Sequence, residues 1–255
     1  MKLALRMDDV GASSKHLCQY GVWDINLFGK KAKINNYFTN FLFLKKFSKF
    51  RKWGPYDELS VANYEELFNF LSKKNLRITL GITACWVDHK NVLTPYYEKF
   101  PKSAEFLKQA SKDNIVEIAN HGLTHCVVGK QSPRLFSGNK KYHREFWDWV
   151  PPSVHYEHIQ KSQNLLQEYF DCSITTLIPP GNVFTLDTVN AASKTGIKLI
   201  NCNAKTENIE GVQIIGNKNI FDFHDREIKL FGVKWLEDQI SNFQDVEFCF
   251  VKDLI

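Results

Sequence analysis

Two short segments, far apart in the chain, carry the side chains with the clearest chemistry. Asp8 and Asp9 follow a short apolar run, and His121 and His125 follow a second apolar run. One carboxylate and two imidazoles form a ligand set of catalytic zinc, because three protein ligands leave a coordination position for water. A second carboxylate beside that water can accept its proton. The pattern therefore predicts a hydrolytic metal site built from two segments.

The elements around these segments must bring them together. Short apolar runs alternate with amphipathic patterns, which is typical of repeated βα units. We expect strands over 2–7, 77–83, 115–119, 175–178, 197–202, 211–215, 228–233 and 246–251, and helices over 62–74, 103–113, 156–170 and 186–195. The Asp pair, the His pair and the turn over 179–182 each follow a predicted strand. Active sites gather at the carboxyl ends of parallel strands, so these residues should meet in space.

Composition limits the class of protein. With 255 residues, of which 44% are hydrophobic, the chain can bury the core of one α/β barrel or of two small domains. The six cysteines form no C-x-x-C pair, which argues against a disulfide framework or a zinc ribbon and favours a reducing compartment. The first residues are too short and too soon charged for a signal peptide, and no apolar stretch reaches the ~20 residues of a spanning helix. We therefore expect a cytoplasmic protein made without a leader.

The two segments resemble motifs of the polysaccharide deacetylase family (carbohydrate esterase family 4). Residues 6–11 read Arg-Met-Asp-Asp-Val-Gly, similar to the family's Thr-Phe-Asp-Asp-Gly, and residues 121–125 read His-Gly-Leu-Thr-His, similar to His-Ser/Thr-x-x-His. The sequence departs from the family by an inserted valine in the first motif and a glycine for Ser/Thr in the second. The variant looks like the branch of the family found in cell-surface polysaccharide biosynthesis.

This resemblance implies both a fold and roles for the residues. The fold would be a single α/β domain over 1–255, a distorted (β/α)7-type barrel. Asp9, His121 and His125 would bind a divalent metal ion, and Asp8 would be the general base. Zinc is the first choice for this ligand set, and nickel, cobalt or manganese accept similar ligands.

The family's third motif, Arg-x-Pro-Tyr-Gly, is matched best by residues 177–182, which contain no arginine. In the family, a backbone N–H here holds the oxyanion. We place Gly181 at that position, because Pro180 has no N–H to donate. Asn182 and Pro180 would then lie beside the substrate. The missing arginine normally orients the base, and Arg6, also a candidate for substrate binding, or Arg226 could substitute for it.

The last motif of the family carries a histidine that acts as general acid after a hydrophobic strand. Residues 221–225 read Phe-Asp-Phe-His-Asp, so the resemblance assigns this role to His224, with Asp222 or Asp225 to hold its ring. An imidazole suits proton transfer near neutral pH. The family's remaining motif, Asp-x-x-Asp-Trp, is not found in the chain.

Two aromatic segments leave alternatives open. Trp147 and Trp149 lie in an aromatic, proline-rich segment that could stack on sugar rings or simply pack as a loop. A basic aromatic insertion spans about 25–57, and lysines and aromatic residues interleave over 36–53 without acids. That stretch could contact the membrane at its inner face, bind an anionic substrate, or serve as an ordinary lid over the barrel.

These observations favour a metal-dependent N-deacetylase or deformylase. Its substrate would be an acylated amino sugar, nucleotide- or lipid-linked, in surface polysaccharide or glycolipid biosynthesis. The alternatives are a metal-dependent hydrolase of another C–N or ester bond, and a catalytically weak protein that binds sugar or lipid phosphate. Nucleic-acid binding is not expected, because only the basic insertion favours it and no recognised binding motif is present.

Overall fold

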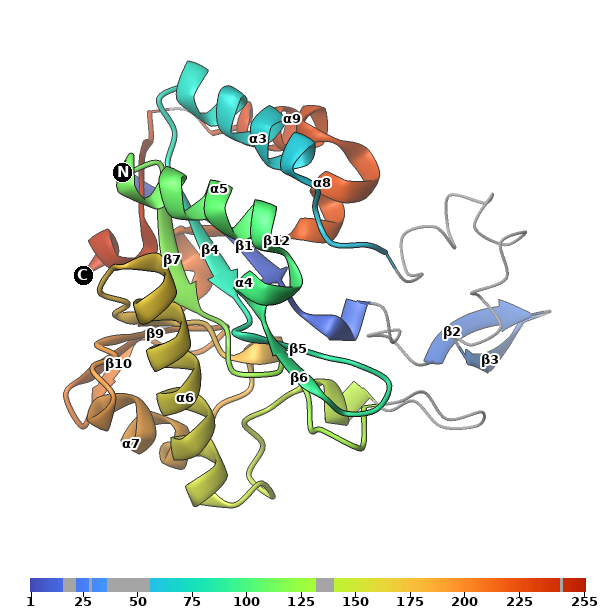
Figure 1. Cartoon of the computed structure of the whole chain (residues 1–255). Helices are drawn as coiled ribbons and strands as arrows, with labels where there is room; N and C mark the ends of the chain where they lie inside the picture. The colour runs from blue at the N-terminus through green and yellow to red at the C-terminus, as the bar shows by residue number, and fades with distance from the viewer. Residues whose placement is uncertain (16–21, 28, 36–55, 132–139, 244) are drawn as a thin grey trace.

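The computed structural model describes residues 1–15, 22–27, 29–35, 56–131, 140–243 and 245–255 (Figure 1). The predicted insertion over 25–57 falls mostly outside these residues. In and just before this insertion, the structure describes the backbone of an antiparallel hairpin, which consists of β2 (Val22–Leu27) and β3 (Lys30–Asn35). The stretch 36–53, predicted to contact a membrane, an anionic substrate or the barrel mouth, lies outside the described residues.

Besides two separate two-stranded pairs, β2–β3 and β5 (Cys85–Val87) with β6 (Leu93–Pro95), the described part of the chain forms a nine-stranded sheet. Its order is β10-β11-β9-β8-β7-β4-β1-β12, with β13 beside the first residues of β1. The strands are β1 (Lys2–Val10), β4 (Ile78–Ile82), β7 (Val116–Asn120), β8 (Thr176–Leu177), β9 (Leu199–Asn201), β10 (Glu207–Ile209), β11 (Val212–Ile215), β12 (Ile220–His224) and β13 (Glu247–Cys249). All neighbours pair in parallel except β10 and β11. The sheet curls into a half-barrel within a single α/β domain, which confirms the predicted distorted (β/α)7-type fold.

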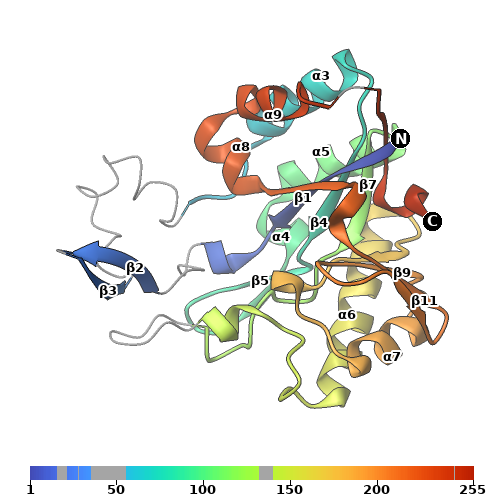
Figure 2. The ribbon, with the colours of Figure 1, turned by 180° about the vertical axis from the view of Figure 1, so that it is seen from behind.

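Helices surround this sheet (Figures 1 and 2). Helices α3 (Val61–Lys73), α8 (Asp225–Phe231) and α9 (Val233–Ile240) gather at one side, and α6 (Pro152–Phe170) and α7 (Leu186–Lys194) pack together at the other. Helix α5 (Pro101–Lys112) follows the short helix α4 (Tyr96–Lys99) and packs against both α3 and β7. None of the helices in the described residues is long and apolar enough to span a bilayer.

The central strands are buried along nearly their whole length, as expected of parallel strands that are covered on both faces. Every residue of β4 and β7 is buried, and so is β1 after its first residue. Their side chains join those of α3 and α5 in the largest hydrophobic cluster, which includes Leu5, Met7, Leu67, Ile78, Leu80, Leu107 and Ile118. The continuous apolar runs in the sequence therefore become the walls of the barrel.

One predicted strand is wrong. Residues 228–233 form the second half of α8 and the first residue of α9. The Glu227 carboxylate accepts a hydrogen bond from the His224 N–H at 2.9 Å, which satisfies a free donor at the start of α8. A short apolar run fits a strand or a buried helix equally well, and this capping contact favours the helix here.

Lys15 and Tyr56, which are far apart in the sequence, are in direct contact. The Tyr56 N–H donates to the Lys15 carbonyl at 3.3 Å, and the Lys15 ammonium lies 5.5 Å from the centre of the Tyr56 ring. Lys15 is 1% exposed and forms ion pairs with Glu58, at 2.6 Å, and with Asp225. Burial lowers the pKa of Lys15, but the two carboxylates outweigh it and raise the pKa above its usual value, so the lysine stays charged.

Candidate active site

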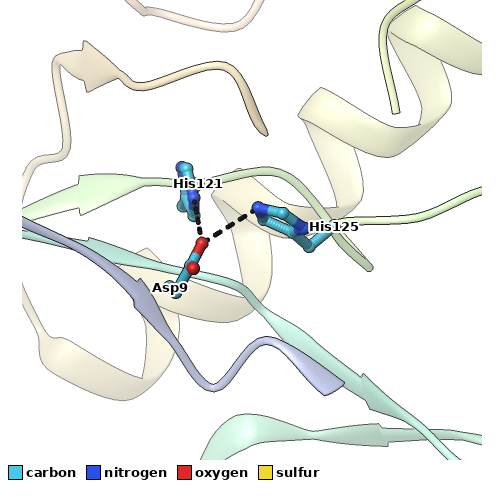
Figure 3. Close-up of side chains that lie close together, drawn as sticks. All are labelled: Asp9, His121 and His125. Carbon is cyan, nitrogen blue, oxygen red and sulfur yellow. Dashed lines mark hydrogen bonds and ion pairs between the residues drawn. The ribbon is translucent and has the colours of Figure 1, made fainter. Parts of the chain in front are cut away.

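Asp9, His121 and His125 converge at the carboxyl end of the parallel strands (Figure 3). The Asp9 Oδ1 atom lies 3.1 Å from Nε2 of His125 and 3.4 Å from Nε2 of His121. One ligand atom from each residue lies within 4.8 Å of the others, and all three residues are buried. The structure thus brings together the three side chains that the sequence predicted to hold a metal ion.

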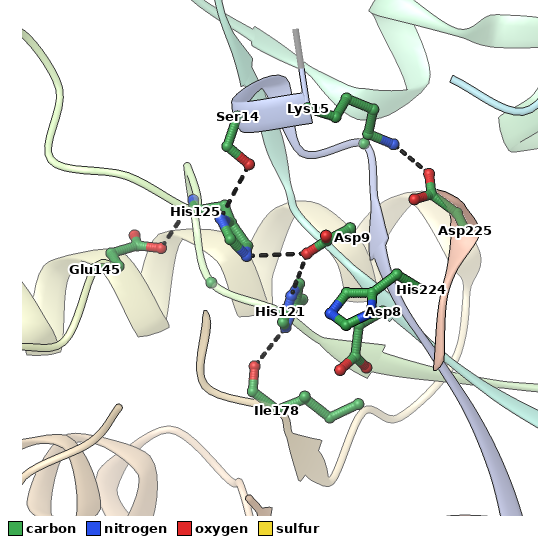
Figure 4. Close-up of polar contacts among 12 residues, drawn as sticks. Asp8, Asp9, Ser14, Lys15, His121, His125, Glu145, Ile178, His224 and Asp225 are labelled. Atoms are coloured by element: carbon green, nitrogen blue, oxygen red, sulfur yellow. Dashed lines mark hydrogen bonds and ion pairs between the residues drawn. The ribbon is translucent and has the colours of Figure 1, made fainter. Parts of the chain in front are cut away.

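An irregularity in β1 positions its two carboxylates. The register between β1 and β4 shifts between Met7 and Val10, and Asp9 has a φ of +70°. In a regular strand, successive side chains point to opposite faces, and a bulge changes where a side chain points. Asp8 and Asp9 therefore both lie at the site, as Figure 4 shows. His125 is also left-handed, with a φ of +56°, so two of the three candidate ligands have a backbone conformation that is uncommon outside glycine.

In His121 and His125, Nδ1 of the ring already has a hydrogen-bond partner. Nδ1 of His121 donates to the Ile178 carbonyl at 2.7 Å, and Nδ1 of His125 lies 3.2 Å from the Ser14 hydroxyl. These contacts leave each Nε2 pointing toward Asp9. Burial raises the pKa of Asp9, but the imidazoles of His125, His224 and His121 outweigh it and hold the pKa well below its usual value. An ionised carboxylate with two oriented imidazoles fits a divalent metal ion.

Asp8 is held by Arg6. An Arg6 Nη2 donates to Asp8 Oδ2 at 2.8 Å, and the same guanidinium contacts Asn201 and, at 3.3 Å, Asp222. The other Asp8 oxygen, Oδ1, is buried without a hydrogen-bond partner among the described residues. Arg6 has no exposed surface, so its predicted contact with substrate does not fit this position. Arg226, the other proposed substitute, pairs with Glu227 at 2.6 Å instead.

His224 lies where the sequence predicted, but its carboxylate neighbour is different. His224 ends β12, pairs in register with Asp8, and its ring lies beside Asp8 and Asp9 (Figure 4). Asp225 points away from it, accepting from the Tyr56 hydroxyl at 2.8 Å and pairing with Lys15. Asp222 contacts Arg6. The His224 ring instead forms an ion-pair contact with Glu227, in which Nδ1 and Oε2 are 3.8 Å apart.

The turn over 179–182 packs against the loop over 121–125, which we call the histidine loop. Gly181 and Asn182 have φ values of +62° and +57°, and the preceding Ile178 carbonyl binds His121. A Cβ on Gly122 would lie 3.1 Å from Cγ of Pro180, so the two loops are in direct contact. Asn182 Oδ1 accepts from the Asn203 N–H at 3.2 Å. Gly181 and Pro180 therefore lie in a turn that contacts the loop carrying the candidate ligands.

Glu145, which sequence reasoning missed, binds the loop that carries the two candidate histidine ligands. Its carboxylate accepts hydrogen bonds from three consecutive N–H groups, those of Leu123 at 3.0 Å, Thr124 at 3.3 Å and His125 at 3.1 Å. It also pairs with His158. Burial raises the pKa of Glu145, but His158 and the backbone hydrogen bonds outweigh it and lower the pKa.

The same carboxylate accounts for the glycine in the second motif. A Cβ on Gly122 would lie 2.2 Å from Oε2 of Glu145, and Gly122 has a φ of +80°. A side chain at position 122 and the Glu145 carboxylate therefore cannot occupy this space together. Nothing in the spacing of the sequence points to Glu145, because its partners are backbone groups of a distant loop.

The two candidate tryptophans differ in exposure. The Trp147 ring is partly buried and its Nε1–H donates to the Lys141 carbonyl at 2.7 Å. Trp149 is 43% exposed and packs edge-on against Tyr142. A separate hollow of about 720 Å³, lined by Lys2, Arg77, Phe248 and neighbours, lies near the two termini and contains none of the candidate site residues.

Comparison with known proteins shows which family and which solved structures this chain is similar to. A family model described as polysaccharide deacetylase matches residues 53–200, and no curated protein matches the chain. A Mycobacterium smegmatis protein assigned as a polysaccharide deacetylase shares the fold, with 11% identity and a TM-score of 0.57 over 98% of this chain and 87% of that one.

Two further solved structures are less similar. A family 4 carbohydrate esterase from Streptomyces lividans, in complex with acetate, has 13% identity and a TM-score of 0.45 over 72% of this chain and 83% of that one. A CE4 family pseudoenzyme from Bacillus anthracis has 11% identity and a TM-score of 0.45 over 76% of this chain and 60% of that one. The family match spans more than half of the chain, which therefore belongs to the polysaccharide deacetylase family.

Proposed function

We propose that the protein is a metal-dependent N-deacetylase or deformylase of an amino-sugar derivative. Asp9, His121 and His125 would hold the divalent ion, with zinc as the first choice and nickel, cobalt or manganese as alternatives. The observation that carries this proposal is the convergence of three buried ligand atoms within 4.8 Å beside a second carboxylate, Asp8. Membership of the family supports a hydrolase that acts on acylated carbohydrate.

The chain's own groups divide the reaction between them. When bound, the ion would lower the pKa of water and polarise the acyl carbonyl. Asp8 would take the proton of the attacking water on Oδ1, the oxygen without a partner, while Arg6 fixes Oδ2. Arg6 thereby takes the role of the arginine missing from the third motif. This substitution supports a working enzyme over a catalytically weak binding protein.

The other side of the substrate would face His224 and Gly181. The His224 side chain is 33% exposed, so it can reach a leaving amine and give it a proton. The Gly181 N–H would stabilise the oxyanion, in the turn next to the histidine loop. Pro180, Asn182, Trp147 and Trp149 would line the space for the sugar.

We infer a cytoplasmic step in surface polysaccharide or glycolipid biosynthesis, on a nucleotide- or lipid-linked sugar. Free thiols at all five cysteines in the described part of the chain support a reducing compartment. Contact of residues 36–53 with the inner face of a membrane is a further proposal, tested by sedimentation with anionic vesicles.

The test is the metal content of the purified protein together with acetate release from acetylated amino sugars. We expect about one ion per chain in the wild type and none in the His121→Ala/His125→Ala variant. The exposed His89 provides a matched control, because His89→Ala removes an imidazole that does not belong to the candidate ligand group. Asp8→Asn should keep the metal and lose activity. A wild type that binds no metal after reloading would overturn the proposal.

A further inference from the structure

Arg144 lies against the turn next to the candidate site. A Cβ on Gly181 would be 2.6 Å from Nε of Arg144 and 2.8 Å from its Cγ, so the arginine side chain covers the space where a larger residue would stand. The guanidinium also lies 5.5 Å from the centre of the Trp147 ring. Arg144 forms no ion pair with a carboxylate in the described part of the chain.

Two lysines repeat this arrangement on the neighbouring surface. The Lys130 ammonium lies 5.9 Å from the Tyr142 ring and 5.6 Å from the Trp149 ring, and the Lys141 ammonium lies 4.9 Å from Tyr142. Neither lysine has a carboxylate partner among the described residues. We call this surface the cation–aromatic patch, and it consists of Lys130, Lys141, Tyr142, Arg144, Trp147 and Trp149.

The patch is attached to the site by short connections. Glu145, the residue after Arg144, binds the backbone of His125, and the Gly181 turn that Arg144 covers begins just after the Ile178 carbonyl that binds His121. The patch therefore adjoins the two loops that position His121 and His125.

We propose that the cation–aromatic patch binds a diphosphate on the amino-sugar substrate, with the aromatic rings beside the sugar. This inference rests on the proposed function. Three cations without carboxylate partners match the charge of a diphosphate, and a guanidinium presents paired donors to phosphate oxygens. Aromatic faces suit sugar or base rings, and they hold the cations in place through cation–π contacts.

The first test measures binding of uridine diphosphate, which has no acyl group and does not require the metal. Arg144→Met keeps most of the stem and removes the charge, so affinity should fall about 10- to 100-fold, the range for one charge-assisted contact. Lys194→Met, on the exposed face of α7, removes the same charge far from the patch and should leave affinity unchanged. Equal affinities in wild type and Arg144→Met would overturn the proposal.

The second test compares the kcat/KM of acetate release from three substrates. They are uridine diphosphate N-acetylglucosamine, a farnesyl diphosphate-linked N-acetylglucosamine and the uncharged N-acetylglucosamine trimer. Arg144→Met should lower the preference for the diphosphates over the trimer about 10-fold or more, mainly through KM. The wild type's better diphosphate substrate then identifies the source as nucleotide or lipid.

An unchanged preference in Arg144→Met would contradict the patch but leave the deacetylase intact. A wild type without metal or acetate release would instead contradict the proposed function, while diphosphate binding would still report on the patch.

Discussion

Replacing Glu145 with alanine removes a side chain that holds three backbone N–H groups of the loop between the two candidate histidine ligands. The carboxylate accepts from three consecutive N–H groups, and both the carboxylate and these groups are buried (Figure 4 shows its contact with His125). The variant therefore removes the acceptor of three backbone donors and of the His158 ring, and it changes no proposed ligand.

The expected magnitude follows from those contacts. A buried donor left without an acceptor costs about 1–3 kcal/mol, so three such donors give roughly 3–9 kcal/mol before water enters the vacated space. Part of this cost is relieved by hydration and by movement of the loop, which displaces His125. Residues that orient a metal ligand typically contribute about 10- to 100-fold to affinity, or about 1.4–2.7 kcal/mol. We expect metal binding to weaken within that range.

Competition with a chelator measures this change directly, and the absorption spectrum of the cobalt-loaded protein reports on ligand geometry. Glu117→Ala is the matched control. Glu117 is equally buried and also accepts a backbone hydrogen bond, from Lys252 at 3.3 Å, but lies toward the opposite end of β7. It should lower stability without changing the cobalt spectrum. If Glu145→Ala weakens metal binding no more than Glu117→Ala does, the assigned role of Glu145 is refuted.

Three further changes test other parts of the site and barrel. Arg6→Lys keeps the charge but loses the planar fork that holds Asp8, so kcat should fall about 10- to 100-fold with KM nearly unchanged, measured by acetate release. Gly81→Ala places a Cβ 3.3 Å from both Asp8 Oδ1 and His121 Cγ, so kcat/KM should fall about 10-fold. Burial raises the pKa of Glu117 above 4.5, so its contribution to stability is full below that pH and is lost as pH rises through the folded-state pKa. Glu117→Gln should therefore gain stability relative to wild type between pH 4 and pH 7 in urea unfolding.

Each of these has an outcome that contradicts it. Unchanged kcat in Arg6→Lys would show that Asp8 needs no orienting cation. Wild-type kinetics in Gly81→Ala would mean that the ring and carboxylate move aside freely. A pH-independent difference between Glu117→Gln and wild type would show that this carboxyl titrates alike in the folded and unfolded chain.

The barrel and the candidate ligands could be predicted from the sequence because their signals are local. Continuous apolar runs mark covered parallel strands, and Asp9, His121 and His125 are metal-binding residue types that follow such runs. The strand predicted over 228–233 is wrong because its apolar residues suit a buried helix as well, and the apolar run alone does not distinguish the two.

The supporting contacts could not be predicted because they exist only in space. Glu145 recognises backbone groups, which no residue pattern in the sequence reveals. Asp225 follows His224 directly, yet the fold pairs it with Lys15 on another element. The Arg6 contact to Asp8, in contrast, could be anticipated, because side chains two residues apart in a strand lie on the same face.

The contact between Lys15 and Tyr56 bears on how much the length of the segment between these two residues can change through insertion or deletion. The chain departs at Lys15 and returns at Tyr56, where a backbone hydrogen bond and a buried ion-pair cluster fasten both ends. The entropy of closing such a loop grows only with the logarithm of its length, about 0.6 kcal/mol for each doubling. Segments of very different length can thus be exchanged between these two residues at little thermodynamic cost.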